Sequence, residues 1–164
     1  MKFKNLVLTL GALMMLTFTS MAAAAPSQVN LSMTAINAAK AEIPAVCELV
    51  GYNVDGDTSI ITFKDPNTLE RYVVDVNTAT AKVQEIEVKG ATFVMGSTMV
   101  TKTPDDIEKI VLKNYPNAYE IVITQGQDGN NIYYIADFLT DKFDGELKLD
   151  PVTGAICERE LEYF

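Results

Sequence analysis

The chain has no histidine and no tryptophan, and it has only two cysteines among 164 residues. Without histidine, neither a Ser-His-Asp triad nor a Cys-His nucleophile can be built. Zinc sites that need histidine are excluded for the same reason, and two cysteines cannot form a Cys₄ site. Basic residues are scarce as well, since 13 Lys and Arg stand against 22 Asp and Glu. The net charge of −9 argues against nucleic acid and anionic membrane surfaces as partners.

Residues 1–24 have the pattern of a secretory signal peptide. Lys2 and Lys4 supply the basic start, the stretch from Leu6 to Phe18 is almost wholly apolar, and Ala22–Ala25 supply small residues for cleavage. The apolar stretch is too short to favour a transmembrane helix, which needs about 20 residues. We expect cleavage between Ala24 and Ala25 and an exported protein, periplasmic or extracellular, without stable membrane insertion.

The remaining chain repeats one order of signals. Each copy begins with a helical pattern that ends at an apolar residue and a proline, Ile43-Pro44 in the first and Tyr115-Pro116 in the second. Runs with strand-like composition follow in both copies, separated by polar turns. We therefore predict a first repeat over 25–90, a strand-like connector over 91–102 and a second repeat over 103–164.

The helix of each repeat can be placed from its start signals. Thr103 is a good N-cap, Pro104 suits the first helical position, and Ile107, Ile110, Val111 and Tyr115 then fall on one face. In the first repeat Ser32 is the expected cap, and the expected buried side is Met33, Ile36, Ala39, Lys40 and Ile43.

The strands alternate between apolar and polar residues, most clearly at 146–150 and 160–163. Such alternation is typical of antiparallel sheets with one buried and one solvated face. Short turns between successive runs favour a meander. The predicted fold class is α+β, with two tandem repeats that each pack one short helix on an antiparallel meander of three to four strands.

One turn motif resembles a known family. Asp150, Pro151, Thr153 and Gly154 form an Asp-Pro-x-Thr-Gly turn between two strand-like runs, and the first repeat has a weaker version with Asn77 and Ala81 in place of the Asp and the Gly. Helix, proline, strands and this turn together resemble the PepSY domain. The tandem arrangement is also similar in architecture to the beta-lactamase-inhibitor protein.

The resemblance implies an exported module that binds or restrains peptidases, because PepSY domains occur in secreted protease propeptides and as free-standing exported modules. It brings no catalytic residues. The chemistry of the motif is itself that of a hairpin turn, since Asp150 can accept backbone N–H bonds and Gly154 permits a positive φ.

Cys47 and Cys157 are 110 positions apart, and an exported protein with two cysteines ordinarily oxidises them. A disulfide between them would tie the first repeat to the second; two buried thiols and an intermolecular bond remain alternatives. The chain has no C-x-x-C pair, which argues against a redox role.

The acidic segments 55–57 and 141–146 do not have the spacing of a calcium loop and are interpreted as turns, so no metal and no cofactor is expected. Tyr52, Tyr133 and Tyr134 are candidate interface anchors, although such tyrosines are also ordinary strand residues.

We expect a protein that is not an enzyme, namely an exported binding module that docks on another exported or envelope protein and inhibits or regulates a peptidase. The alternative is a periplasmic small-ligand or cation-binding protein that uses acidic loops or a cleft between the repeats.

Overall fold

A computed structural model of the chain describes residues 26–90 and 96–164, with side chains described from Ser32 onward. The expected signal peptide, its cleavage site and residues 91–95 of the expected connector lie outside these ranges. The described elements, in chain order, are α1 (Pro26–Ala41), β1 (Glu48–Asp55), β2 (Thr58–Lys64), β3 (Arg71–Asn77), β4 (Val83–Lys89), α2 (Pro104–Asn114), β5 (Tyr119–Asp128), β6 (Asn131–Leu139), β7 (Phe143–Leu149) and β8 (Ile156–Tyr163).

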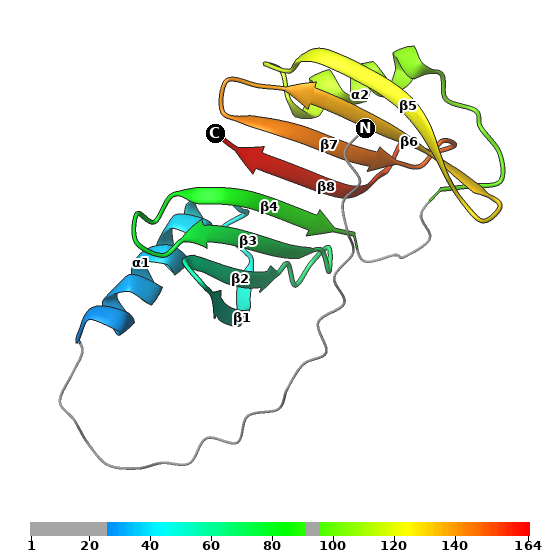
Figure 1. Cartoon of the computed structure of the whole chain (residues 1–164). Helices are drawn as coiled ribbons and strands as arrows, with labels where there is room; N and C mark the ends of the chain where they lie inside the picture. Colours follow the sequence, from blue (N-terminus) through cyan, green and yellow to red (C-terminus); the bar gives the residue numbers. More distant parts are fainter. Residues whose placement is uncertain (1–25, 91–95) are drawn as a thin grey trace.

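All the described strands belong to one eight-stranded antiparallel sheet with the order β1-β2-β3-β4-β8-β7-β6-β5 (Figure 1). Each unit consists of a helix followed by a four-stranded meander, which confirms the predicted fold class. The two meanders are joined edge to edge, because β4 of the first unit pairs with β8 of the second. The two predicted meanders therefore form one continuous sheet.

Both helices pack on the same face of the sheet, with α1 against β2 and β3 and α2 against β5 and β6. Figure 1 shows them behind the sheet. Side chains that point to the helices alternate with side chains on the other face, and the first set forms the core. We call the second face the open face, since no helix of the described residues lies on it.

The first helix differs from its prediction in its start and in its buried side. It begins at Pro26 instead of near Ser32. Within the helix the fully buried residues are Ala35 and Ala39, four positions apart, and Ile43 is buried just beyond its end, whereas the predicted Met33 and Lys40 are exposed. The two alanines let the helix axis approach the sheet closely.

The second helix follows its prediction. The Thr103 side chain accepts a hydrogen bond from the Asp106 N–H, and the Asp106 carboxylate accepts one from the Thr103 N–H, so the two form a capping box. Ile107 and Val111 are fully buried against the sheet. The helix ends at Asn114, two residues before Pro116.

The predicted turn motif has the same geometry in both units. Asp150 Oδ1 accepts hydrogen bonds from the Val152 and Thr153 N–H groups (3.0 and 2.7 Å) and from the Thr153 hydroxyl (2.9 Å). Asn77 Oδ1 accepts the equivalent three bonds from residues 79 and 80. Each turn ends at a residue with positive φ, Ala81 at 56° and Gly154 at 74°. The weaker first copy is therefore the same turn as the second.

A third turn of this kind joins β2 to β3 and was not predicted. Asp65 Oδ1 accepts hydrogen bonds from the Asn67 and Thr68 N–H groups (2.7 and 3.2 Å), and Leu69 has a φ of 63°. The signal was present in the sequence, because Asp65-Pro66-x-Thr68 has the same spacing as Asp150-Pro151-x-Thr153.

The expected disulfide between Cys47 and Cys157 is absent, and both thiols are free. Cys47 precedes β1, and Cys157 lies in β8, four strands away in the sheet. Four strand spacings amount to about 19 Å, whereas a disulfide needs Cα atoms within about 7 Å. Burial raises the pKa of both thiols, so they are poor nucleophiles.

Candidate functional site

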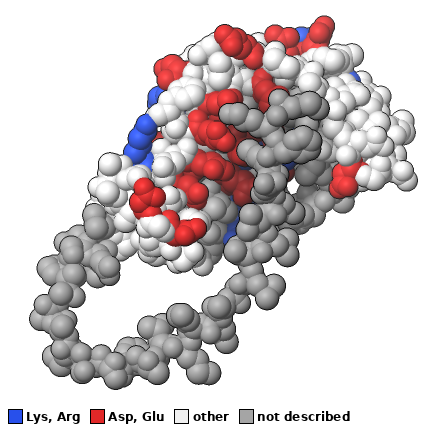
Figure 2. All heavy atoms as spheres, in the orientation of Figure 1, with Lys and Arg blue, Asp and Glu red and all other residues white. Residues whose placement is uncertain are grey.

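The register of the sheet brings acidic side chains from both units together on the open face. In one row across the strands, Glu87, Glu160, Glu146 and Asp137 stand directly opposite one another. In the next row, the same is true of Asp75, Glu85, Glu162 and Asp144. These eight residues, which we call the acidic block, occupy β3, β4, β8, β7 and β6. Figure 2 shows acidic side chains gathered over the middle of this face.

The block is bordered on one side by a third row that contains cations. Lys64, Arg71, Lys89 and Lys148 lie in this row together with Glu158. Lys89 forms an ion pair with Glu87 (2.7 Å), and Lys148 forms ion pairs with Glu158 and Glu146 (3.2 and 3.5 Å). The cations therefore neutralise one edge of the block, and among the described residues no ion pair involves the opposite row, from Asp75 to Asp144.

The carboxylates of the block disfavour one another's ionisation. Burial and the charge of Glu87 raise the pKa of Asp75, and burial and the charge of Glu160 raise the pKa of Glu85. The pKa values of Asp137 and Glu160 are raised in the same way, by burial first and then by Glu146. Like charges directly opposite each other in a sheet are destabilising, so the block costs folding free energy.

Five of these residues, Asp137, Asp144, Glu146, Glu160 and Glu162, line a shallow hollow of about 220 Å³ over β6, β7 and β8. Within residues 26–90 and 96–164, no group of three or more His, Cys, Asp or Glu side chains has the geometry to hold a metal ion. The block thus offers a broad field of negative charge.

The structure does not bring the three candidate interface tyrosines together. Tyr52 lies on the edge strand β1, 40% exposed, on the helix side of the sheet. The ring of Tyr133 lies across Gly126, whose pairing partner it is on the open face. Tyr134 is 2% exposed in the core, and its hydroxyl donates a hydrogen bond to the Lys102 carbonyl (2.8 Å). In this conformation Tyr134 is a core residue and not an interface anchor.

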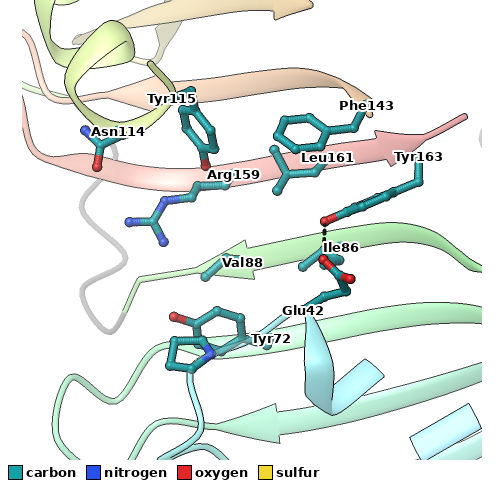
Figure 3. Close-up of a pocket in the computed structure, with 11 residues that line it drawn as sticks. Glu42, Tyr72, Ile86, Val88, Asn114, Tyr115, Phe143, Arg159, Leu161 and Tyr163 are labelled. Carbon is teal, nitrogen blue, oxygen red and sulfur yellow. Dashed lines mark hydrogen bonds between the residues drawn. The ribbon is translucent and has the colours of Figure 1, made fainter. Parts of the chain in front are cut away.

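The helix side of the sheet contains a second candidate site, a groove of about 370 Å³ between the two units. Its floor is apolar and consists of Ile86 and Val88 on β4 and Leu161 on β8 (Figure 3). One wall is Tyr72 of the first unit. The opposite wall is an aromatic row of the second unit, in which Phe143 packs between Tyr115 and Tyr163 at ring-centroid distances of 5.9 and 5.3 Å.

Charged residues of opposite sign stand at the two ends of this groove. Figure 3 shows the Arg159 guanidinium at one end, and Glu42 at the other, where the Tyr163 hydroxyl donates to its Oε2 (3.2 Å). Arg159 Nη1 lies 3.4 Å from Glu70 Oε1. The Tyr72 hydroxyl donates to the other oxygen of Glu70 (2.9 Å). Sequence reasoning missed both ends, because each joins residues of different units.

Comparisons with known proteins assign no family. No family model and no curated protein matches the chain. Among solved structures, a crystal structure of "a putative lipoprotein" from Clostridium difficile 630 matches at 18% identity, with a TM-score of 0.32, over 78% of this chain and 90% of that one. A similarity at this level supports no argument about fold or function. In the described part of the chain, no helix is both long and apolar enough to cross a membrane.

Proposed function

We propose that the protein is an exported, non-catalytic binding module whose acidic block docks on a basic surface of another exported or envelope protein. The observation that carries the proposal is the pairing of four acidic residues in each of two adjacent rows of the open face. The like charges of this face lower the stability of the free protein, so a cationic partner that neutralises them gains binding free energy from the relief of their repulsion. The sequence pattern of a signal peptide supports export.

More specifically, we propose that the protein is a tandem PepSY-like protein that restrains a peptidase. It is supported by the turn geometry shared by Asn77 and Asp150 and by the resemblance of the surrounding sequence to PepSY domains. The open face extends over eight strands contributed by both units, which supports docking on a folded partner.

The test is a comparison of three proteins that start at Ala25, each immobilised and exposed to envelope and culture extracts. The first is the natural sequence. The second carries Glu87→Gln, Glu146→Gln and Glu160→Gln in the acidic block. The third, a control with the same net charge, carries Asp57→Asn, Asp105→Asn and Glu108→Gln, which lie at exposed positions of the β1–β2 turn and α2.

We expect one exported protein to be retained by the first and third proteins and lost from the second, with retention falling as salt is raised. If it is a peptidase, its hydrolysis of a substrate should be slowed by the natural sequence and not by the block variant. Retention by all three proteins, or by none, would refute docking through the block.

A further inference from the structure

The groove on the helix side is independent of the acidic block, and we infer that it binds a short apolar peptide as a zwitterion. In this arrangement the peptide carboxylate pairs with Arg159, its ammonium group lies at Glu42, and its apolar side chains rest on the floor between the aromatic walls. The groove volume of about 370 Å³ is in the range of small-ligand sites.

Arg159 is suited to bind a carboxylate because most of its donors are unused. A guanidinium group has five N–H donors in a planar fork, and within the described residues the only hydrogen bond or ion pair of Arg159 is the 3.4 Å approach of Nη1 to Glu70. The side chain of Arg159 is 24% exposed and lies among the apolar and aromatic residues that line the groove, and partial burial strengthens a charge-assisted hydrogen bond. Tyr115 and Tyr72 flank the guanidinium in Figure 3.

Glu42 is suited to bind the ammonium group. Its Oε2 accepts one hydrogen bond from Tyr163, so the carboxylate is held at the rim of the groove and has a further oxygen to offer. The groove therefore has an acceptor end, a donor end and an apolar middle, which is the charge distribution of a free peptide with apolar side chains.

The net charge of the protein favours this ligand over a simple anion. A monocarboxylate would be repelled by the charge of −9, whereas a zwitterion carries no net charge and meets only the local fields at the two ends. Among molecules with a carboxylate for Arg159, an uncapped apolar peptide thus fits better than a fatty or aromatic acid.

The probe is the dipeptide L-leucyl-L-phenylalanine, compared with its C-terminal amide and with its N-acetylated form by calorimetric or NMR titration of the chain from Ala25. We expect the natural sequence to bind the free dipeptide about tenfold or more tightly than the amide, because a hydrogen bond to a charged group is lost. Arg159→Gln should remove the preference for acid over amide, and Arg71→Gln, an equal change on the open face, should leave it intact.

Glu42→Gln supplies an independent variant at an exposed position, with Glu48→Gln as its control. It should remove the preference for the free over the acetylated amino group and keep the preference for acid over amide, even if Arg159→Gln fails to fold. Equal binding of acid and amide by the natural sequence, or no binding at millimolar dipeptide, would overturn the inference and leave the proposal for the acidic block untouched.

Discussion

The two equivalent turns have the same hydrogen bonds but different residues at their last position, which makes Ala81 and Gly154 a useful pair for comparison. Ala81 and Gly154 end the turns with φ values of 56° and 74°, a region in which a Cβ is strained. The same position thus has a strained residue in one unit and an unstrained one in the other, within almost identical hydrogen bonds.

We predict opposite effects of exchanging the two residues. Ala81→Gly should raise the free energy of unfolding by about 0.5–1 kcal/mol, because relief of the φ strain exceeds the entropy cost of glycine. Gly154→Ala should lower it by more than this, since the new Cβ would also lie 2.5 Å from Ile110 Cδ1. Urea denaturation measures both, and a loss of stability in Ala81→Gly would contradict the argument.

For single residues, the sequence predicts the structure where the role of a residue depends only on its neighbours in the chain. The sequence predicts the turn at Asp150 and Gly154 and the cap at Thr103, because both signals act within a few residues of the chain, and the structure confirms them. Arg159 and Glu42 could not be assigned, since their roles depend on contacts with Glu70 and with Tyr163 of the other unit.

Among the elements, β8 lies at the centre of the sheet and contains acidic residues in two opposite settings. Glu160 faces Glu87 on one neighbouring strand and Glu146 on the other, whereas Glu158 faces Lys89 and Lys148. Glu160 is therefore surrounded by like charge, whereas Glu158, two positions earlier on the same strand, is surrounded by opposite charge.

We predict that neutralising these two residues has effects of opposite sign. Glu160→Gln should stabilise the protein by about 0.2–1 kcal/mol, as two like-charged cross-strand pairs are removed, and Glu158→Gln should destabilise it by a similar amount. Thermal melts at low salt measure the difference, and both effects should shrink at high salt. Equal shifts of the same sign would show that register does not determine the charge environment.

The strands themselves were predicted well, because alternation along one strand reports which side is buried. The strand order where the two units meet was not predicted, since no local pattern specifies that β4 should pair with β8. Both candidate sites depend on this pairing. The acidic block takes its rows from strands of both units, and the groove has its floor on the two strands that meet there.

For the molecule as a whole, the acidic block sets an unusual dependence of stability on pH. Because the pKa values of Asp75, Glu85, Asp137 and Glu160 are raised, the folded state binds more protons than the unfolded state in mild acid, and stability falls as these groups ionise with rising pH. We therefore predict a melting temperature that rises as the pH is lowered from 7 to about 5.

Two carboxylates whose pKa values are lowered should limit this rise at still lower pH. Burial raises the pKa of Asp150, but the hydrogen bonds from Thr153, Ser97 and Val152 outweigh it, so its pKa is lowered. Hydrogen bonds from Thr103 lower the pKa of Asp106. Their stabilisation is lost below about pH 4. In alkali, burial beside Glu42 raises the pKa of Tyr163 to about 12, so stability should fall from about pH 10 upward. A steady fall in melting temperature from pH 7 to 4 would contradict the acidic part of this profile.

The strand order relates the two units by an approximate two-fold rotation about an axis between β4 and β8. A chain with only one unit would leave its fourth strand as an open edge, which a second copy of the same chain can cover. Having both units in one chain makes this association independent of concentration. The two units of one chain can also differ in sequence. In a dimer of identical units every charge beside the β4–β8 pair would occur twice, once at each end of the groove. Here one end can be acidic through Glu42 and the other basic through Arg159.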